Sequence, residues 1–168
     1  MLHGIILGGG ALLGLSAALY TMATVGGSSH DTPESLNSRS KQLSGLLIAT
    51  SVVLWTAVLV GTYISFPPYR ATPPEGITDL AAYPRSLLTS NENTRWLHSF
   101  AMEIKEHMPW IAAMLTTSVA VVATRDKPQL LADQSIRRMA TSLLTVSFAL
   151  VAFVSLLGIF INKVAPLQ

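Results

Sequence analysis

Hydrophobic residues along this chain form four long blocks separated by polar segments. The blocks contain no Asp, Glu, Lys or Arg and run from Gly4 to Val25, Leu43 to Phe66, Met108 to Thr124 and Met139 to Ile161. A helix needs about 20 mainly apolar residues to cross a bilayer core, and three blocks are long enough alone. Because backbone polar groups inside lipid must be bonded within their own segment, each block is expected to be a helix. The pattern predicts an all-α integral membrane protein, a bundle of four transmembrane helices.

The blocks belong to one predicted membrane domain over residues 1–168, with helices at about 4–25, 43–66, 95–124 and 139–161. The third helix should start before its apolar block, with Asn93 or Thr94 as N-cap, which gives it an amphipathic extension outside the membrane core. The first block is longer than the apolar region of a signal peptide and has no basic residue before it, so we interpret it as a mature helix.

The longest polar segment, between the second and third helices, runs from Pro67 to about Asn93 and contains "SFPPYRATPPEG" and "YPRSLL". Paired prolines fix φ and remove N–H donors, so this segment is expected to be an ordered, extended extramembrane loop without helix, folded over the bundle. Residues 26–42 are polar and turn-rich without helical periodicity, and 125–138 form a short basic loop.

Composition narrows the class of function. Half of the residues are hydrophobic and 12% are charged, against about 25% charged in soluble domains. The net charge of +2 is distributed among the loops, which excludes a nucleic-acid surface, and the absence of cysteine excludes disulfides and thiolate metal sites. No phosphate-binding loop, HExxH, CxxCH or nucleophile elbow is present. We therefore do not expect the chain to be an enzyme by itself.

Basic residues set the expected orientation. With four spans, both termini and the loop 67–93 share one side of the membrane. The basic residues Arg125, Lys127, Arg137 and Arg138 lie at helix ends on the other side, where they weigh most in the positive-inside rule. The prediction is a bacterial inner (cytoplasmic) membrane protein with its termini and loop 67–93 outside.

Small residues mark two predicted packing stripes. Gly10, Gly14 and Ala18 repeat every four residues on the first helix, and Ala57 and Gly61 do the same on the second. Such stripes let helix backbones approach closely in lipid, where packing replaces the hydrophobic effect. The alternative interpretation is a glycine-lined groove for a cofactor or lipid.

The densest group of titratable residues precedes the third apolar block, in "HSFAMEIKEHMPW". Glu103 and His107 are spaced i,i+4 on one helix face, with Glu106 at its edge. A carboxylate one turn from a histidine can orient the ring and raise its basicity. Pro109 should free the carbonyl of Lys105 and kink the helix.

Depth suggests a partner for His107. It lies about 27 Å from Arg125 along the helix, near the edge of a hydrocarbon core of about 30 Å. His3 opens the first helix at the same boundary. Two histidines at matched depth on different helices are the minimum for a b-type haem, so His3 and His107 are candidate cofactor ligands.

The same cluster has other interpretations. Glu103, Glu106 and His107 could instead hold a divalent metal, and the cluster could border a quinone site. The simplest interpretation is a boundary solvated by headgroups and water, with Lys105 paired to Glu103 or Glu106 and reaching outward. His98, on another face, is assigned to the aqueous side or to a partner.

Two functional hypotheses follow. The first is a small membrane-embedded subunit of a larger respiratory or photosynthetic-type electron-transfer complex, with the His/Glu cluster at its outer face. The alternative is a non-catalytic scaffold or anchor that binds partner subunits through its glycine-striped helices and the loop 67–93. Both imply membrane lipid and other membrane or peripheral subunits as partners. A transporter is disfavoured because no charged or broken helix marks a midplane site.

Overall fold

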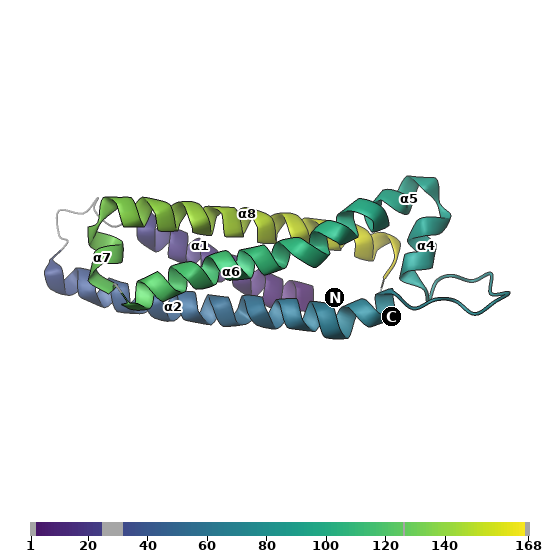
Figure 1. Cartoon of the computed structure of the whole chain (residues 1–168), viewed down its shortest axis with the longest axis horizontal. Helices are drawn as coiled ribbons and strands as arrows, with labels where there is room; N and C mark the ends of the chain where they lie inside the picture. The colour runs from purple at the N-terminus through teal and green to yellow at the C-terminus, as the bar shows by residue number, and fades with distance from the viewer. Residues whose placement is uncertain (1–2, 25–31, 126, 167–168) are drawn as a thin grey trace.

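The computed structural model of the chain describes residues 3–24, 32–125 and 127–166, which form helices and connecting loops without any strand. Four helical stretches are long and apolar enough to cross a membrane: Gly4–Thr24, Pro33–Tyr69, Glu92–Arg125 and Gln134–Val164. The predicted all-helical architecture with four potential spans is confirmed. Figure 1 shows the stretches side by side, with both chain termini and the loop before α4 at one end and α7 at the other. We call these the terminal end and the α7 end.

Three of the long stretches contain a π-helical segment, and two short helices lie in the connections. The elements, in chain order, are η1 (Gly4–Gly8, π), α1 (Gly9–Thr24), α2 (Pro33–Val60), η2 (Gly61–Ser65, π), α3 (Phe66–Tyr69), α4 (Pro84–Ser90), α5 (Glu92–Trp96), η3 (Leu97–Met102, π), α6 (Glu103–Arg125), α7 (Lys127–Ala132) and α8 (Gln134–Val164).

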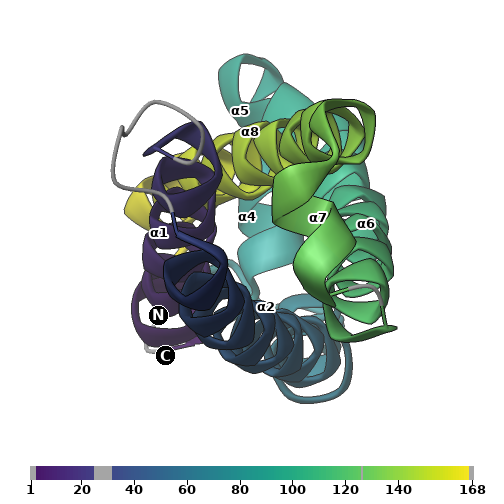
Figure 2. The same cartoon turned by 90° about the vertical axis from the view of Figure 1, so that its left-hand side faces the viewer.

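The four long helices enclose one apolar core. α2 packs on α6, α6 on α8, and α1 on both α2 and α8, so the helices close a ring that Figure 2 shows from the α7 end. Each helix contributes a fully buried side chain to this core: Leu15, Leu47, Ala112 and Leu144. Many large apolar side chains point outward instead, as expected of helices that face lipid.

A close helix contact joins α1 and α2. A Cβ at Gly14 would collide with the Thr50 hydroxyl and lie 3.1 Å from both Thr50 Cβ and Cγ2. Gly10 lies in ordinary contact with Val53, and Ala18 is fully buried. On α2, Ala57 is half-buried, whereas a Cβ at Gly61 would meet nothing within 4 Å. The first stripe therefore packs inside this chain, and Gly61 has open space.

The polar segment before the second apolar block is helical from Pro33, about ten residues earlier than predicted. The Thr32 hydroxyl accepts a hydrogen bond from the Ser35 N–H, Pro33 occupies the first turn, and Glu34 lies at the positive end of the helix dipole. The expectation of an irregular 26–42 segment is wrong for residues 33–42, because these start signals outweigh the missing periodicity. Residues 26–31 lie outside the described residues.

The proline-rich segment 67–93 contains more helix than predicted. Pro67 and Pro68 lie in the first turn of α3, and Pro84 starts α4. Pro84 is tolerated there because the N–H groups of a first turn have no helical acceptor. Pro67 and Pro68 follow η2 without a break and lie in the last turn of the second helical stretch, which ends at Tyr69. Residues 71–83 are irregular, with Gly76 at φ 84°. In Figure 1 this loop projects beyond the bundle and does not fold over it.

Two other boundaries differ from the prediction. The third stretch begins at Asn91, whose side chain accepts from the Asn93 N–H, and not at Asn93 or Thr94. The loop 125–138 contains α7, and Asp133 caps α8 by accepting from the Ser135 and Ile136 N–H groups, so α8 starts five residues before the apolar block. Local capping side chains set both helix starts.

Candidate functional site

The terminal end carries the candidate site. A second buried cluster there includes Tyr69, Leu88, Leu97 and Leu157, which join α3, α4, η3 and α8. The three π-helical segments of the described chain also lie toward this end. Such segments are frequent at functional sites because they rotate side chains out of the regular helical register.

His3 precedes η1 and lies beside the end of η2. Its Nδ1 is 3.2 Å from the Ser65 hydroxyl at the end of η2, and the two side chains share a hydrogen bond. His3 is half-buried. Burial is the main cause that holds the pKa of His3 below its usual 6.5, and nearby positive charge, including that of Lys105, adds to the effect. His3 therefore faces Ser65 and the Lys105 side of α6.

Lys105 points into the bundle and not outward. Its side chain crosses the surface of α8 at Gly158, where a Cβ would lie 3.4 Å from Nζ and 3.7 Å from Cε. It forms no ion pair or hydrogen bond with any described residue, so the expected pairing with Glu103 or Glu106 is not observed. Successive helix positions are rotated by about 100°, so Lys105 lies about 200° from Glu103 and about 100° from Glu106 around the helix axis.

His98 takes part in a contact that the sequence did not suggest. The Tyr69 hydroxyl is 2.8 Å from His98 Nδ1, and Tyr69 is buried. The Tyr69 ring also stacks on the Phe66 ring, with 6.0 Å between the ring centroids. The guanidinium carbon of Arg70 lies 5.3 Å from the centroid of the Phe66 ring. His98 thus secures α3 to η3, although the sequence assigned it to water or a partner. In the sequence, only the i,i+3 spacing of Phe66 and Tyr69 indicated part of this contact.

His107 is exposed on α6, and a main-chain group orients its ring. The His107 Nδ1 lies 2.8 Å from the carbonyl oxygen of Glu103, to which Nδ1–H donates. The carboxylate of Glu103 is therefore not the group that holds the ring. Nε2 has no hydrogen bond to a described residue, so in this tautomer it is an available acceptor or metal ligand. Glu103 is exposed beside it, and Glu106 is half-buried.

The structure does not bring His3 and His107 into one site. His3 is near Lys105, and residues 105 and 107 are about 200° apart around the helix axis. Within the described ranges, no group of three or more His, Asp or Glu side chains could hold a metal ion. A haem held by His3 and His107, and a metal or quinone at Glu103, Glu106 and His107, stay predictions.

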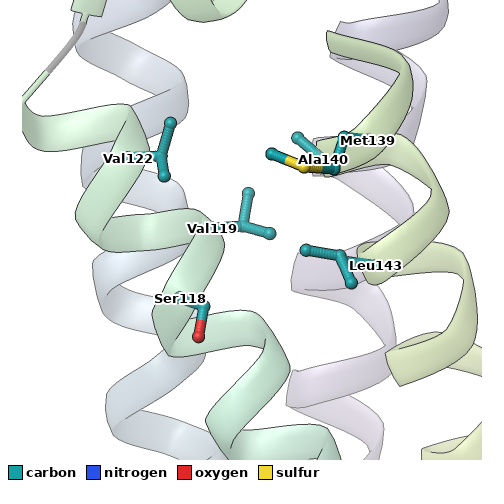
Figure 3. Close-up of a pocket in the computed structure, with 6 residues that line it drawn as sticks. All are labelled: Ser118, Val119, Val122, Met139, Ala140 and Leu143. Carbon is teal, nitrogen blue, oxygen red and sulfur yellow. The ribbon is translucent and has the colours of Figure 1, made fainter. Parts of the chain in front are cut away.

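The cavities of the bundle offer little ligand chemistry. A space of about 130 Å³ between α6 and α8, shown in Figure 3, is apolar except for Ser118, whose hydroxyl donates to the Met114 carbonyl. A groove of about 390 Å³ between α2 and α6 contains Trp55, whose Nε1–H donates to the Thr117 hydroxyl at 3.0 Å. Both spaces lie within the apolar part of the bundle, away from the titratable residues.

Comparisons with protein-family models, with curated proteins and with solved structures each found no significant match.

Proposed function

We propose that the chain is a non-enzymatic, membrane-embedded subunit of a larger membrane assembly, and that it docks a partner through one face of its third helical stretch. The observation that carries this proposal is the exposed Glu103–His107 pair within a continuous row of exposed large apolar side chains. We call this row the α6 face. It consists of Trp96, Phe100, Glu103, His107, Ile111 and Met114.

The α6 face has the spacing of a helix-docking surface. Glu103, His107, Ile111 and Met114 are three or four residues apart within α6, as in one stripe of an amphipathic helix, and Trp96 and Phe100 add exposed aromatic side chains before and within η3. Apolar exposure alone would indicate only lipid, because other spans also expose large apolar residues. The Glu103 carboxylate and the His107 imidazole in the middle of the row indicate more than lipid, since polar groups at the membrane border are costly and often functional.

Depth distinguishes a protein partner from lipid. Phe100 is 57% exposed and lies about 37 Å from Arg125 along the helix, beyond a hydrocarbon core of about 30 Å. Acyl chains therefore do not reach Phe100, and the polar handle that suits Trp to the headgroup region is absent from Phe. A partner protein that continues past the membrane surface would cover the row along its whole length.

The absence of native cysteine makes this proposal directly testable. Single substitutions Phe100→Cys and Met114→Cys are made in the tagged chain, expressed in its native membrane, labelled with a thiol-specific benzophenone and irradiated, so that the label inserts into C–H bonds of any neighbouring protein. We expect heavier adducts from both positions. Leu13→Cys and Ile159→Cys are matched controls, because these side chains, on α1 and α8, are more exposed than Phe100 and Met114. Equal adducts from all four positions, or none from the α6 face, would contradict docking through that face.

A second candidate function, electron transfer, is favoured by His107. Nδ1–H on a main-chain carbonyl with Nε2 unengaged is the arrangement in which second-shell bonds hold a metal-ligating imidazole. In this version, His107 would be one ligand of a haem or metal held between this chain and its partner. The test is a reduced-minus-oxidised optical spectrum, with metal analysis, of the intact assembly. A signal that is lost in His107→Ala but kept in His98→Ala would support it; an unchanged signal would exclude ligation by His107.

The projecting loop 71–83 is the proposed contact for a peripheral subunit. It is irregular and largely exposed, and the residues that flank it include the buried side chains of Tyr69 and Leu88. Such a loop adds little to the core of the bundle, and exposed loops that a rigid scaffold positions commonly carry binding function.

A further inference from the structure

An unpaired hydroxyl lies at the larger groove of the bundle. Ser51 of α2 is 7% exposed, and its oxygen is buried without a hydrogen-bond partner, the one such side-chain nitrogen or oxygen among the described residues. Ser51 also lines the groove of about 390 Å³ between α2 and α6, two helices that lie side by side in Figure 1. An unpaired buried hydroxyl is unfavourable, so an acceptor supplied by another molecule would stabilise it.

Other hydroxyls of α2 show which bond Ser51 lacks. The Thr50 and Thr56 hydroxyls each donate to the main-chain carbonyl four residues earlier, as serine and threonine commonly do within helices. Ser51 makes no such bond to Leu47, and its oxygen is covered by neighbouring atoms. Contact with a ligand in the groove therefore requires rotation of the side chain about the Cα–Cβ bond. That rotation is fast and breaks no hydrogen bond.

The depth of Ser51 limits what can pair with it. Ser44 donates to the Ala123 carbonyl, which places these two residues at one level. Ala123 is about 3 Å from Arg125 along α6, and Ser51 follows Ser44 by about 10 Å along α2. If Arg125 marks a membrane boundary, Ser51 lies about 13 Å inside it, near the middle of a core of about 30 Å. Water and the ester carbonyls of phospholipids do not reach that depth.

The walls of the groove fit a neutral, apolar molecule. Within the described chain, no charged residue lines it, and its rim includes the exposed side chains of Ile48, Val52 and Val121, so it opens toward lipid. Trp55 Nε1–H donates to the Thr117 hydroxyl, which itself donates to a carbonyl of α6. These polar groups are therefore engaged, and the Ser51 hydroxyl is left as the donor for a ligand. The volume lies within the usual range of small-molecule sites, about 300–1,000 Å³.

We propose that this groove binds the ring of a lipid-soluble quinone, with one ring carbonyl accepting a hydrogen bond from Ser51. A quinone is neutral, dissolves at this depth, carries an acceptor and has a flat ring that can pack against the Trp55 indole. An acyl chain would leave the hydroxyl unpaired.

The shape of the groove also favours a ring over a partner helix. The hydrogen bonds Ser44–Ala123 and Trp55–Thr117 join α2 to α6 on either side of Ser51. The groove is thus bounded along the helices, whereas a transmembrane partner would need a continuous channel. The site shares no residue with the α6 face and does not depend on docking there. It is also separate from the Glu103, Glu106 and His107 cluster.

The test titrates the detergent-purified chain with decylbenzoquinone and follows the quenching of its tryptophan fluorescence. Quenching should saturate, because Trp55 lines the groove, and decylbenzene, which has the ring and chain but no carbonyl, should compete poorly. Ser51→Ala should weaken the affinity by about two- to twelvefold, the value of one neutral hydrogen bond. Ser118→Ala is the matched control and should bind as the wild type does, because Ser118 lies outside this groove and its hydroxyl donates to the Met114 carbonyl.

Stability without quinone is the second measurement. Ser51→Ala removes an unpaired buried oxygen, so its free energy of unfolding in denaturant should equal or exceed that of the wild type. A less stable or unfolded Ser51→Ala chain would mean that the hydroxyl is already bonded within the bundle, which would overturn the proposal.

The binding arms have contradicting results of their own. Quenching that does not saturate in the wild-type chain would overturn the site, and this arm requires no variant to fold. Equal competition by decylbenzene, unchanged affinity in Ser51→Ala, or an equal loss in Ser118→Ala would overturn the hydrogen bond from Ser51. If the wild type binds no quinone but Ser51→Ala loses its partner subunits in the native membrane, the groove holds a partner helix and the proposal is wrong.

Discussion

The imidazole of His107 is held by the main-chain carbonyl of Glu103, one turn earlier on the same helix, at 2.8 Å from Nδ1. This bond fixes the ring without using either carboxylate, so the Glu103 side chain and Nε2 of His107 both remain available on the exposed surface. The arrangement costs the bundle little and contributes no contact to its core. It is the strongest local indication that this surface meets another molecule.

Gly14 gives the clearest stability prediction. In Gly14→Ala, the new methyl group would collide with Thr50, and overpacking of this kind costs about 1–3 kcal/mol. Gly45→Ala is the control, since its Cβ would meet nothing within 4 Å. Denaturant unfolding in detergent should show a lower free energy for Gly14→Ala and an unchanged or slightly higher one for Gly45→Ala. Equal stability of the two variants would contradict the close α1–α2 contact.

Tyr69 tests how the terminal end is held together. Tyr69→Phe removes the hydroxyl that bonds His98 Nδ1 and leaves the ring packing intact. The expected loss in unfolding free energy is about 0.5–1.5 kcal/mol. Tyr63→Phe should change little, because Tyr63 is 70% exposed. A loss of the same size in both variants would mean that the Tyr69–His98 bond contributes nothing specific.

His3 predicts a pH dependence of stability. Its pKa in the folded chain is below the usual 6.5, so between these two values the folded state binds fewer protons than the unfolded state. Stability should therefore fall as the pH is lowered through about 6.5 toward the folded pKa. The midpoint of thermal unfolding in His3→Gln should depend less on pH across this range. An unchanged slope in that variant would assign the effect to another group.

The projecting loop can be changed without touching the bundle. Replacement of residues 71–82 by a Gly/Ser sequence of equal length keeps Tyr69 and Leu88 in place, so the melting midpoint should stay close to that of the wild type. If the loop binds a peripheral subunit, that subunit should be lost from the purified assembly. An assembly of unchanged composition would remove this role from the loop.

The apolar blocks were sufficient to predict the four spans, because membrane thickness dictates their length and lipid excludes charge. They could not predict where helices continue outside lipid. Thr32 and Asp133 start α2 and α8 earlier than hydropathy suggests, since capping is a local hydrogen-bond effect. The second helical stretch likewise continues through Pro67 and Pro68 and ends at Tyr69, so the first proline did not mark its boundary.

The candidate site was less predictable than the spans. Glu103 and His107 share a face as their spacing requires, but the bond to a carbonyl in place of a carboxylate is a rotamer choice. Lys105 was expected to reach outward. Its inward direction depends on how α6 is rotated against Gly158, a residue 53 positions later in the chain. The Tyr69–His98 bond also joins residues distant in sequence, which no spacing rule reveals.

The most direct test of the account is the size of the particle that the tagged chain forms when it is extracted from its native membrane in mild detergent. We predict an assembly whose protein mass, after the bound detergent is subtracted, is well above the 18.0 kDa of one chain. The double variant Phe100→Ala/His107→Ala should release it as a folded single subunit, while Leu13→Ala/Ile159→Ala should leave the assembly intact. A wild-type chain that runs alone, or an assembly that persists in the α6-face variant, would contradict docking through this face.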